Sequence, residues 1–381
     1  MEPDISDEQE FFAETTRKFL TDKADVTALR SLRHDPMGYD ASYWTQGCEL
    51  GWVSLLVSEE DGGGSISGEA IMDLALVAYE FGRQAGPGPL LSQNAVAYAL
   101  SQGGTDQQKA DVLGGVMMGE IRVGWGPSGP SAGDRADRLP VSAVASGDGY
   151  TLNGTALPVE SGNTSQYFLV AADTDQGKTQ FLVPADSAGV SVAAMGTVDL
   201  TKRFSAVTFT NVSVPSSAVV GTVGGAAIDV ARQLQIVNAL QAAEMTGALD
   251  TAMEITIEWM HNRYSFGRPL ASYQALKHRF AEMKMWQEAS HAIADAAAHA
   301  VQDNTDDAAR LVSAAKAYIG QYGPELCHEC IQMHGGIGVT FDHDLHLYLR
   351  RVSLNASLYG SVNDHRLQLA DIVDSHKEAV A

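Results

Sequence analysis

The sequence predicts an α+β fold of three successive domains: a helical domain over residues 1–120, a β-sandwich or β-barrel domain over 121–222, and a helical bundle over 223–381. Two observations predict it. The spacing of apolar residues changes twice along the chain, and turn-forming residues separate the segments. With 381 residues, the chain is long enough for two or three domains, each with its own core.

The N-terminal region predicts helices. Between residues 5 and 120, apolar residues recur three or four positions apart, which places them on one face of a helix. Turns rich in glycine and proline at 61–64 and 86–89 interrupt these segments. The two clearest apolar runs are Phe11, Phe12, Thr15 and Phe19, and then Ile71, Leu74, Ala75, Val77 and Ala78.

The middle region predicts strands, and the last region predicts helices again. Short β-rich runs separated by Gly, Asp and Asn turns indicate the strands. From residue 224 to 374 the chain returns to long segments rich in Ala, Leu and Met, and the alanines of 289–300 alone favour a helix. The predicted strands cover residues 141–145, 150–152, 167–171, 179–183 and 206–209.

The composition argues against several classes of partner. A net charge of −22 opposes binding to nucleic acid or to an anionic membrane surface. The acidic first ten residues show no secretory signal, and no apolar run reaches the ~18 residues of a membrane-spanning helix. Three cysteines are too few for a disulfide framework. We therefore expect a soluble, cytoplasmic protein.

A first candidate motif runs from Arg263 through Phe266 and Gly267 to Gln274. Its pattern predicts a helix that ends in an arginine, a glycine turn and a new helix. An arginine offers a bidentate fork to phosphate, and a glutamine amide both donates and accepts hydrogen bonds. The alternative is that Arg263 only satisfies the last carbonyls of its own helix. Taken alone, the motif favours this alternative.

A second candidate motif is the stretch QMHGGIG at 332–338. Adjacent glycines let a backbone approach a phosphate or sugar closely and present N–H groups to it, although a plain helix C-cap also requires glycine. Cys327 and Cys330 lie just before this stretch, together with His328. A zinc site normally needs a second ligand pair, and no further cysteine follows, so we expect no metal here.

Together with the domain order, four stretches make the chain resemble the acyl-CoA dehydrogenase family over nearly its whole length. A fifth stretch, HDLHLYLRR at 343–351, is most similar to an actinobacterial branch, many members of which act on steroid CoA thioesters. The four stretches are GW at 51–52 with SEEDGGG at 58–64, DGYTLNG at 148–154, RYSFG at 263–267 with Gln274, and QMHGGIG at 332–338.

The resemblance implies the family's fold, with a C-terminal four-helix bundle, and a flavin enzyme. Family members remove the α-proton of an acyl-CoA with a carboxylate while the β-hydrogen passes as hydride to FAD. An electron-transfer flavoprotein then takes the electrons. In this family each FAD lies across a dimer interface. The resemblance assigns contacts with the neighbour's FAD to Arg263, Ser265, Phe266, Gln274, Gln332, Gly335 and Gly336.

The residues that would build the chain's own active site depart from the family pattern. The family's TEP-GAGSD loop reads GWGPSGPSAGD at 124–134, and its W-x-T pair falls on Pro158 and Glu160. Tyr359 stands where the catalytic glutamate precedes a glycine. A phenol loses its proton about six pKa units above a carboxylic acid, so Tyr359 is no ready base at neutral pH.

A second base position, used by some family members, falls on Val237, and the neighbouring arginine for the CoA phosphate falls on Asn238. Glu244 follows seven residues after Val237 and therefore lies on the same helical face. It could act as a relocated base. The alternative is that Glu244 pairs in the core with a cation such as Lys316 or Arg263, as buried carboxylates usually do.

Three hypotheses follow from this pattern. The leading one is that the chain is the non-catalytic subunit of an α2β2 heterotetramer and completes the FAD site of a catalytic partner that oxidises an acyl-CoA. The second is a homo-oligomeric dehydrogenase with Glu244 as its base, and the third is a structural relative without flavin. No histidine is singled out as a base among His278, His334, His343 and His346.

Overall fold

The computed structural model describes residues 5–127 and 141–380. Its N-terminal part is helical, as predicted. The first helix begins at a capping box, in which the Ser6 hydroxyl accepts from the Gln9 amide N–H (3.2 Å) and the Gln9 side chain accepts from the Ser6 N–H (3.0 Å). The helices are α1 (Asp7–Lys23), α2 (Val26–Leu29), α3 (Ala41–Glu49), α4 (Ala70–Arg83), α5 (Leu90–Gly103), α6 (Asp106–Gln108) and α7 (Gly114–Met117).

Buried aromatic rings form the centre of this N-terminal part. Trp52 is fully buried and packs edge-on against Phe81 of α4, with ring centroids 4.8 Å apart. Phe19 of α1 meets the same indole at 5.3 Å. These contacts explain the apolar periodicity of the N-terminal sequence, because α1 and α4 turn their apolar faces towards Trp52.

The central part is a β-domain, in which all five predicted runs lie within strands. Most pairs are antiparallel, but β4 pairs in parallel with both β1 and β2. The described strands follow the order β6-β7-β3-β2-β4-β5-β8, with β1 beside β4. They are β1 (Val123–Gly126), β2 (Val141–Ser146), β3 (Gly149–Glu160), β4 (Tyr167–Thr174), β5 (Gly177–Pro184), β6 (Val190–Met195), β7 (Phe204–Pro215) and β8 (Val219–Val220).

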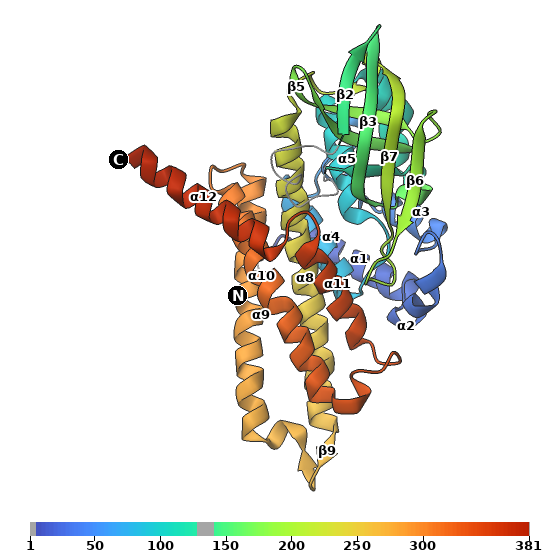
Figure 1. The fold of residues 1–381 in the computed structure, drawn as a ribbon. Helices are drawn as coiled ribbons and strands as arrows, with labels where there is room; N and C mark the ends of the chain where they lie inside the picture. Colours follow the sequence, from blue (N-terminus) through green and yellow to red (C-terminus); the bar gives the residue numbers. More distant parts are fainter. Residues whose placement is uncertain (1–4, 128–140, 381) are drawn as a thin grey trace.

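The C-terminal part is a bundle of long helices (Figure 1). α8 is its central member, because it packs against α4 of the N-terminal part as well as against α9, α10 and α11. α12 extends away from the bundle at its C-terminal end (Figure 1). Within the described ranges, no helix combines the length and apolar character needed to cross a membrane. The helices are α8 (Ala226–Asn262), α9 (Gln274–Gln302), α10 (Ala308–His334), α11 (Leu345–Ser357) and α12 (Val362–Val380).

Candidate functional site

The first motif forms an exposed hairpin between α8 and α9. Arg263 follows the last residue of α8, and a two-residue strand pair, β9 (Tyr264–Ser265) with β10 (Arg268–Pro269), turns the chain at the lower tip of Figure 1. Phe266 is 97% exposed and has a φ of 49°, a left-handed conformation that is uncommon outside glycine. An apolar ring held out in this way predicts a binding partner for the hairpin.

The second motif forms the loop after α10. Helix α10 ends at His334 and is capped by Gly335, whose φ of 64° and ψ of −140° suit only glycine. Gln332, Gly335 and Gly336 are exposed, and a Cβ atom added at either glycine would have no described atom within 4 Å. The backbone therefore has room for close approach by a ligand, and its contact with a phosphate or sugar stays a prediction.

The two motifs meet at one end of the bundle. The Trp259 ring, one turn before Arg263, stacks on the His334 ring with centroids 5.1 Å apart and planes 21° apart. The Arg263 guanidinium carbon lies 5.6 Å from the Trp259 ring centroid. We call this surface the bundle end and define it by the seven residues assigned to FAD contacts: Arg263, Ser265, Phe266, Gln274, Gln332, Gly335 and Gly336.

The position of the family's catalytic glutamate is closed. Tyr359 lies in the turn between α11 and α12, with a φ of 58°. Its buried ring packs against the buried indole of Trp125 at 5.0 Å between centroids. Burial, reinforced by the nearby charge of Glu160, raises the pKa of Tyr359 well above that of a free phenol. The side chain is therefore a packed core residue in the protonated state.

Trp125 lies in the stretch that the resemblance assigns to the family's flavin loop. It belongs to β1, and its indole N–H donates to the Gln233 side chain at 3.0 Å. Gln233 in turn exchanges hydrogen bonds with Gln180 of β5. The remainder of the expected loop, Ser128–Asp134, lies outside the described residues.

Glu244 is buried and paired with a cation, but that cation is neither of the two named from the sequence. One carboxylate oxygen accepts from Arg351 at 2.6 Å and the other accepts from Asn355 at 2.8 Å. Lys316 and Arg263 make no ion pair with it among the described contacts. The expected pairing with a core cation is confirmed, but the two examples named were wrong, because Arg351 of α11 faces α8 at this depth and no pattern in the sequence indicates it.

Lys316 has a different role. Its ammonium group donates to the Gln241 side chain and to the backbone carbonyls of Asn355 and Leu358, at the end of α11. Burial lowers the pKa of Lys316 to about 7, against the opposing effect of the Glu244 charge. The three acceptors match the three hydrogens of the charged form. Lys316 thus fixes the turn that carries Tyr359.

Arg351 joins all three parts of the molecule. It pairs with Glu244 of α8 and, at 2.7 Å, with Asp199 of the segment between β6 and β7, and it donates to the carbonyl oxygens of Ala85 and Gly86. Burial alone would raise the pKa of Asp199, but the guanidinium outweighs it and holds this pKa at about 2. Asp199 therefore stays charged in the interior.

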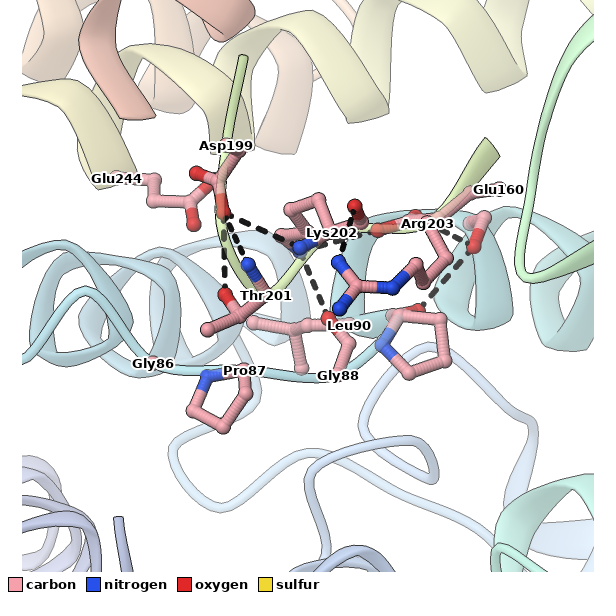
Figure 2. A network of polar contacts seen from close by, with 12 residues as sticks. Gly86, Pro87, Gly88, Leu90, Glu160, Asp199, Thr201, Lys202, Arg203 and Glu244 are labelled. Carbon is pink, nitrogen blue, oxygen red and sulfur yellow. Dashed lines mark hydrogen bonds and ion pairs between the residues drawn. The ribbon is translucent and has the colours of Figure 1, made fainter. Parts of the chain in front are cut away.

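A second buried ion pair lies beside the first. Glu160, where the family has the threonine of its W-x-T pair, meets Lys202 at 3.1 Å and accepts from Ser92 of α5 at 2.7 Å. Lys202 also donates to the carbonyl of Gly88 at 2.7 Å. Figure 2 shows Lys202 between Glu160 on one side and Asp199 with Glu244 on the other. We call Glu160, Asp199, Lys202, Glu244 and Arg351 the closed junction.

The two other active-site positions that the resemblance assigns, Val237 and Asn238, also lie in the interior. Val237 is fully buried, and Asn238 donates to the carbonyl of Tyr359 at 3.5 Å. Cys327 and Cys330 are buried thiols, and burial raises the pKa of Cys330 to about 12. No cluster of three or more metal-ligating side chains occurs in the ranges 5–127 and 141–380.

The fold and two family models define the class of protein. The chain matches the family model described as acyl-CoA dehydrogenase, N-terminal domain, over residues 6–120, and that described as acyl-CoA dehydrogenase, C-terminal domain, over residues 227–373. The chain therefore belongs to the acyl-CoA dehydrogenase family.

Three individual relatives cover most of the chain. Acyl-CoA dehydrogenase IpdE2 of Mycobacterium tuberculosis is 28% identical over 93% of this chain and 94% of its own. Acyl-CoA dehydrogenase FadE27 of the same organism is 29% identical over 81% of this chain and 82% of its own. Among solved structures, a variant of the Tcur3481-Tcur3483 steroid ACAD has a TM-score of 0.87 at 27% identity, covering 97% of this chain and 99% of that one.

Proposed function

We propose that this chain is the non-catalytic subunit of a flavin-dependent, cytoplasmic acyl-CoA dehydrogenase. It assembles with a catalytic relative as an α2β2 heterotetramer and completes the partner's FAD site. The reaction is α,β-dehydrogenation of an acyl-CoA, with a steroid or another bulky CoA thioester as substrate. An electron-transfer flavoprotein accepts the electrons.

The observation that carries the proposal is the open bundle end. Its polar side chains suit the polar half of FAD: the Arg263 guanidinium would bind the pyrophosphate, and the Gln332 amide would hydrogen-bond to the same half. Gly335 and Gly336 leave room for a phosphate or sugar beside the backbone. When bound, FAD supplies the hydride acceptor of the reaction. These residues hold and orient it, and Phe266 excludes water beside it.

The closed junction supports the non-catalytic assignment. The Glu244 carboxylate is buried and held by Arg351 and Asn355, so a substrate would have to displace these partners to reach it. Trp125 and Tyr359 pack ring against ring where the family places its flavin loop and its base. A chain with this interior has no described group in a position to act as the base.

The solved relatives support assembly with a second subunit. The name of the Tcur3481-Tcur3483 protein pairs two chains and states a steroid enzyme. A second structure, described as the ChsE4-ChsE5 complex of Mycobacterium tuberculosis, shares the fold with a TM-score of 0.89 at 23% identity over 98% of this chain and 99% of that one. Both agree with a hetero-oligomer as the working state of this chain.

The test is FAD content and oligomeric state, measured first on this chain purified alone after expression with excess flavin. The second sample is the chain co-expressed with a family member that carries the catalytic glutamate and the TEP loop. We expect little FAD on the chain alone and FAD retained in the co-purified complex. Arg263→Ala should lower the FAD content of the complex, whereas Arg310→Ala, a partly exposed arginine elsewhere in the bundle on α10, should not.

Each rival hypothesis has its own outcome. One tightly bound FAD per chain in a homo-oligomer would overturn the proposal and make Glu244→Gln the next variant to measure for turnover. FAD absent from both samples, with no effect of Arg263→Ala on any property of the complex, would support a structural relative without flavin. The proposed function is supported only if FAD is retained by the co-purified complex and not by this chain alone.

A further inference from the structure

A column of stacked side chains connects the two motifs of the bundle end. The Arg263 guanidinium lies over the Trp259 ring, and the Trp259 ring stacks on His334. His334 in turn meets His343 edge-on, with centroids 4.5 Å apart and planes 65° apart. We call Arg263, Trp259, His334 and His343 the ring column. It joins the end of α8 to the end of α10 and to the loop that follows.

His334 is the central member of this column and is only 5% exposed. Its Nδ1 lies 2.8 Å from the carbonyl oxygen of Cys330, which can only accept, so Nδ1 carries the hydrogen. The other nitrogen, Nε2, is then an unprotonated acceptor, and it is buried without a hydrogen-bond partner among the described residues. The neutral ring is therefore the form that fits this site.

A proton on Nε2 would create a positive charge that is buried and has no hydrogen-bond acceptor at that nitrogen among the described residues. Burial lowers the pKa of His334, and proximity to His343 lowers it further, against an opposing effect of the Cys330 carbonyl. The Cys330 thiol stays uncharged, since burial raises its pKa to about 12. The charged or titratable groups around the ring are Arg263 beyond Trp259, Cys330 one turn before, His343, and the Arg30–Asp344 ion pair (2.6 Å) beside His343.

We propose that His334 is a positioning residue that, as a neutral ring, holds the Arg263 hairpin and the Gly335–Gly336 loop in one arrangement, and that its protonation releases this coupling. The proposal deepens the proposed function and rests on it, because it predicts that FAD bound at the bundle end is released as the pH falls. It also predicts a change in the chain by itself, which needs no flavin: acid separates Trp259 from its stacked partner.

The first test uses this chain alone. The contribution of Trp259 to fluorescence is obtained as the difference between the native chain and Trp259→Phe, and is followed as the pH falls through and below the ordinary histidine range. We expect one transition below that range, which disappears in His334→Phe, a variant that keeps a flat ring but cannot titrate. His299→Phe, an exposed histidine on α9, should leave the transition unchanged. A transition that persists in His334→Phe overturns the proposal.

The second test measures FAD dissociation from the complex with a catalytic subunit. His334→Ala should weaken FAD binding about three- to tenfold at neutral pH, the value of one aromatic pair. His334→Phe should bind FAD as the native chain does and no longer release it in acid. Unchanged FAD binding in His334→Ala, where Arg263→Ala does weaken it, would overturn the positioning role and leave the proposed function standing. No effect of Arg263→Ala would instead contradict the proposed function.

Discussion

The bundle end and the closed junction differ in whether their charged side chains are exposed or buried and paired. At the closed junction, two acidic side chains surround Arg351, a third meets Lys202, and all five side chains are almost completely buried. At the bundle end, Arg263 and Gln332 are exposed, and Phe266 is almost fully solvated. Every charge of the first region is paired within the chain, whereas the second region offers a cation and open backbone to something outside it.

Under the proposed function, this difference explains how a subunit keeps part of a flavin site without the chemistry. A catalytic cleft needs an unpaired base and room for the substrate, both of which are costly for folding. In this chain the corresponding space holds ion pairs and the Trp125–Tyr359 contact, which link the three domains directly. A surface that binds a neighbouring chain's cofactor needs neither a buried unpaired base nor an internal cleft. Its polar groups can therefore stay exposed to solvent without a cost in folding free energy.

The largest effect is expected from Arg351→Met. Removing the guanidinium leaves Glu244 and Asp199 buried without a countercharge, and breaking a buried pair in this way costs about 3–5 kcal/mol. The free energy of unfolding in urea measures the loss. Arg310→Met, which removes a solvent-accessible pair with Asp307, should cost less than about 1 kcal/mol.

A triple variant sharpens this prediction. In Arg351→Met/Glu244→Gln/Asp199→Asn neither acidic partner of Arg351 is left unpaired, so it should regain a substantial part of the stability that Arg351→Met loses. If Arg351→Met unfolded at the same urea concentration as the native chain, the closed junction would not be what holds the domains together.

The next effect concerns the bundle end. In the complex with a catalytic subunit, Arg263→Ala should raise the Kd for FAD about tenfold to a hundredfold, because a hydrogen bond to a charged phosphate is lost. Gln332→Ala removes a neutral hydrogen bond and should raise the Kd for FAD about two- to tenfold. Calorimetric titration of the flavin-free complex measures both. An unchanged Kd in both variants, with Arg310→Ala as the reference, would remove the bundle end from the flavin site.

Acid should also weaken the closed junction, through Asp199. The pKa of Asp199 is about 2 in the folded chain against 3.8 for a free carboxyl, so the unfolded chain takes up the proton first. The stability that Asp199 contributes, about 2 kcal/mol, is therefore complete above about pH 5 and is lost as the pH falls towards 2. Urea unfolding at several pH values measures it.

One variant and one control isolate the contribution of Asp199 to the pH dependence of stability. Asp199→Asn should flatten the dependence of unfolding free energy on pH over this window, relative to the native chain. Asp303→Asn, at an exposed position after α9, should leave the dependence unchanged. Equal slopes in the native chain and in Asp199→Asn would contradict the charged state assigned to this buried carboxylate.

The sequence predicted the bundle end better than the closed junction, for a physical reason. The features of the bundle end are local: a helix end, a glycine turn and an exposed arginine follow one another within a few residues. The closed junction depends on pairs far apart in the chain, since Arg351 lies 107 residues from Glu244 and 152 from Asp199. Periodicity placed Glu244 on the buried face of α8, but periodicity cannot identify which cation faces it from another helix.

The strand predictions also depended on local sequence alone. Runs such as 179–183 were predicted because β-forming residues between turns indicate strands. β6 (Val190–Met195) was missed: its residues are exposed or partly exposed, and its pairing with β7 depends on the partner strand rather than on its own composition.

The smallest effect should come from Tyr359→Phe. The Tyr359 hydroxyl is buried and has no hydrogen-bond partner among the described residues, so its removal should leave stability unchanged or raise it by up to about 1 kcal/mol. Tyr43 gives the contrast: its hydroxyl donates to the carbonyl of Pro87 at 3.2 Å, and Tyr43→Phe should lose about 1 kcal/mol. In the complex, turnover by Tyr359→Phe should equal that of the native subunit, because the proton is removed in the partner. Turnover abolished with FAD still bound would make Tyr359 a catalytic residue and would contradict the non-catalytic assignment of this chain.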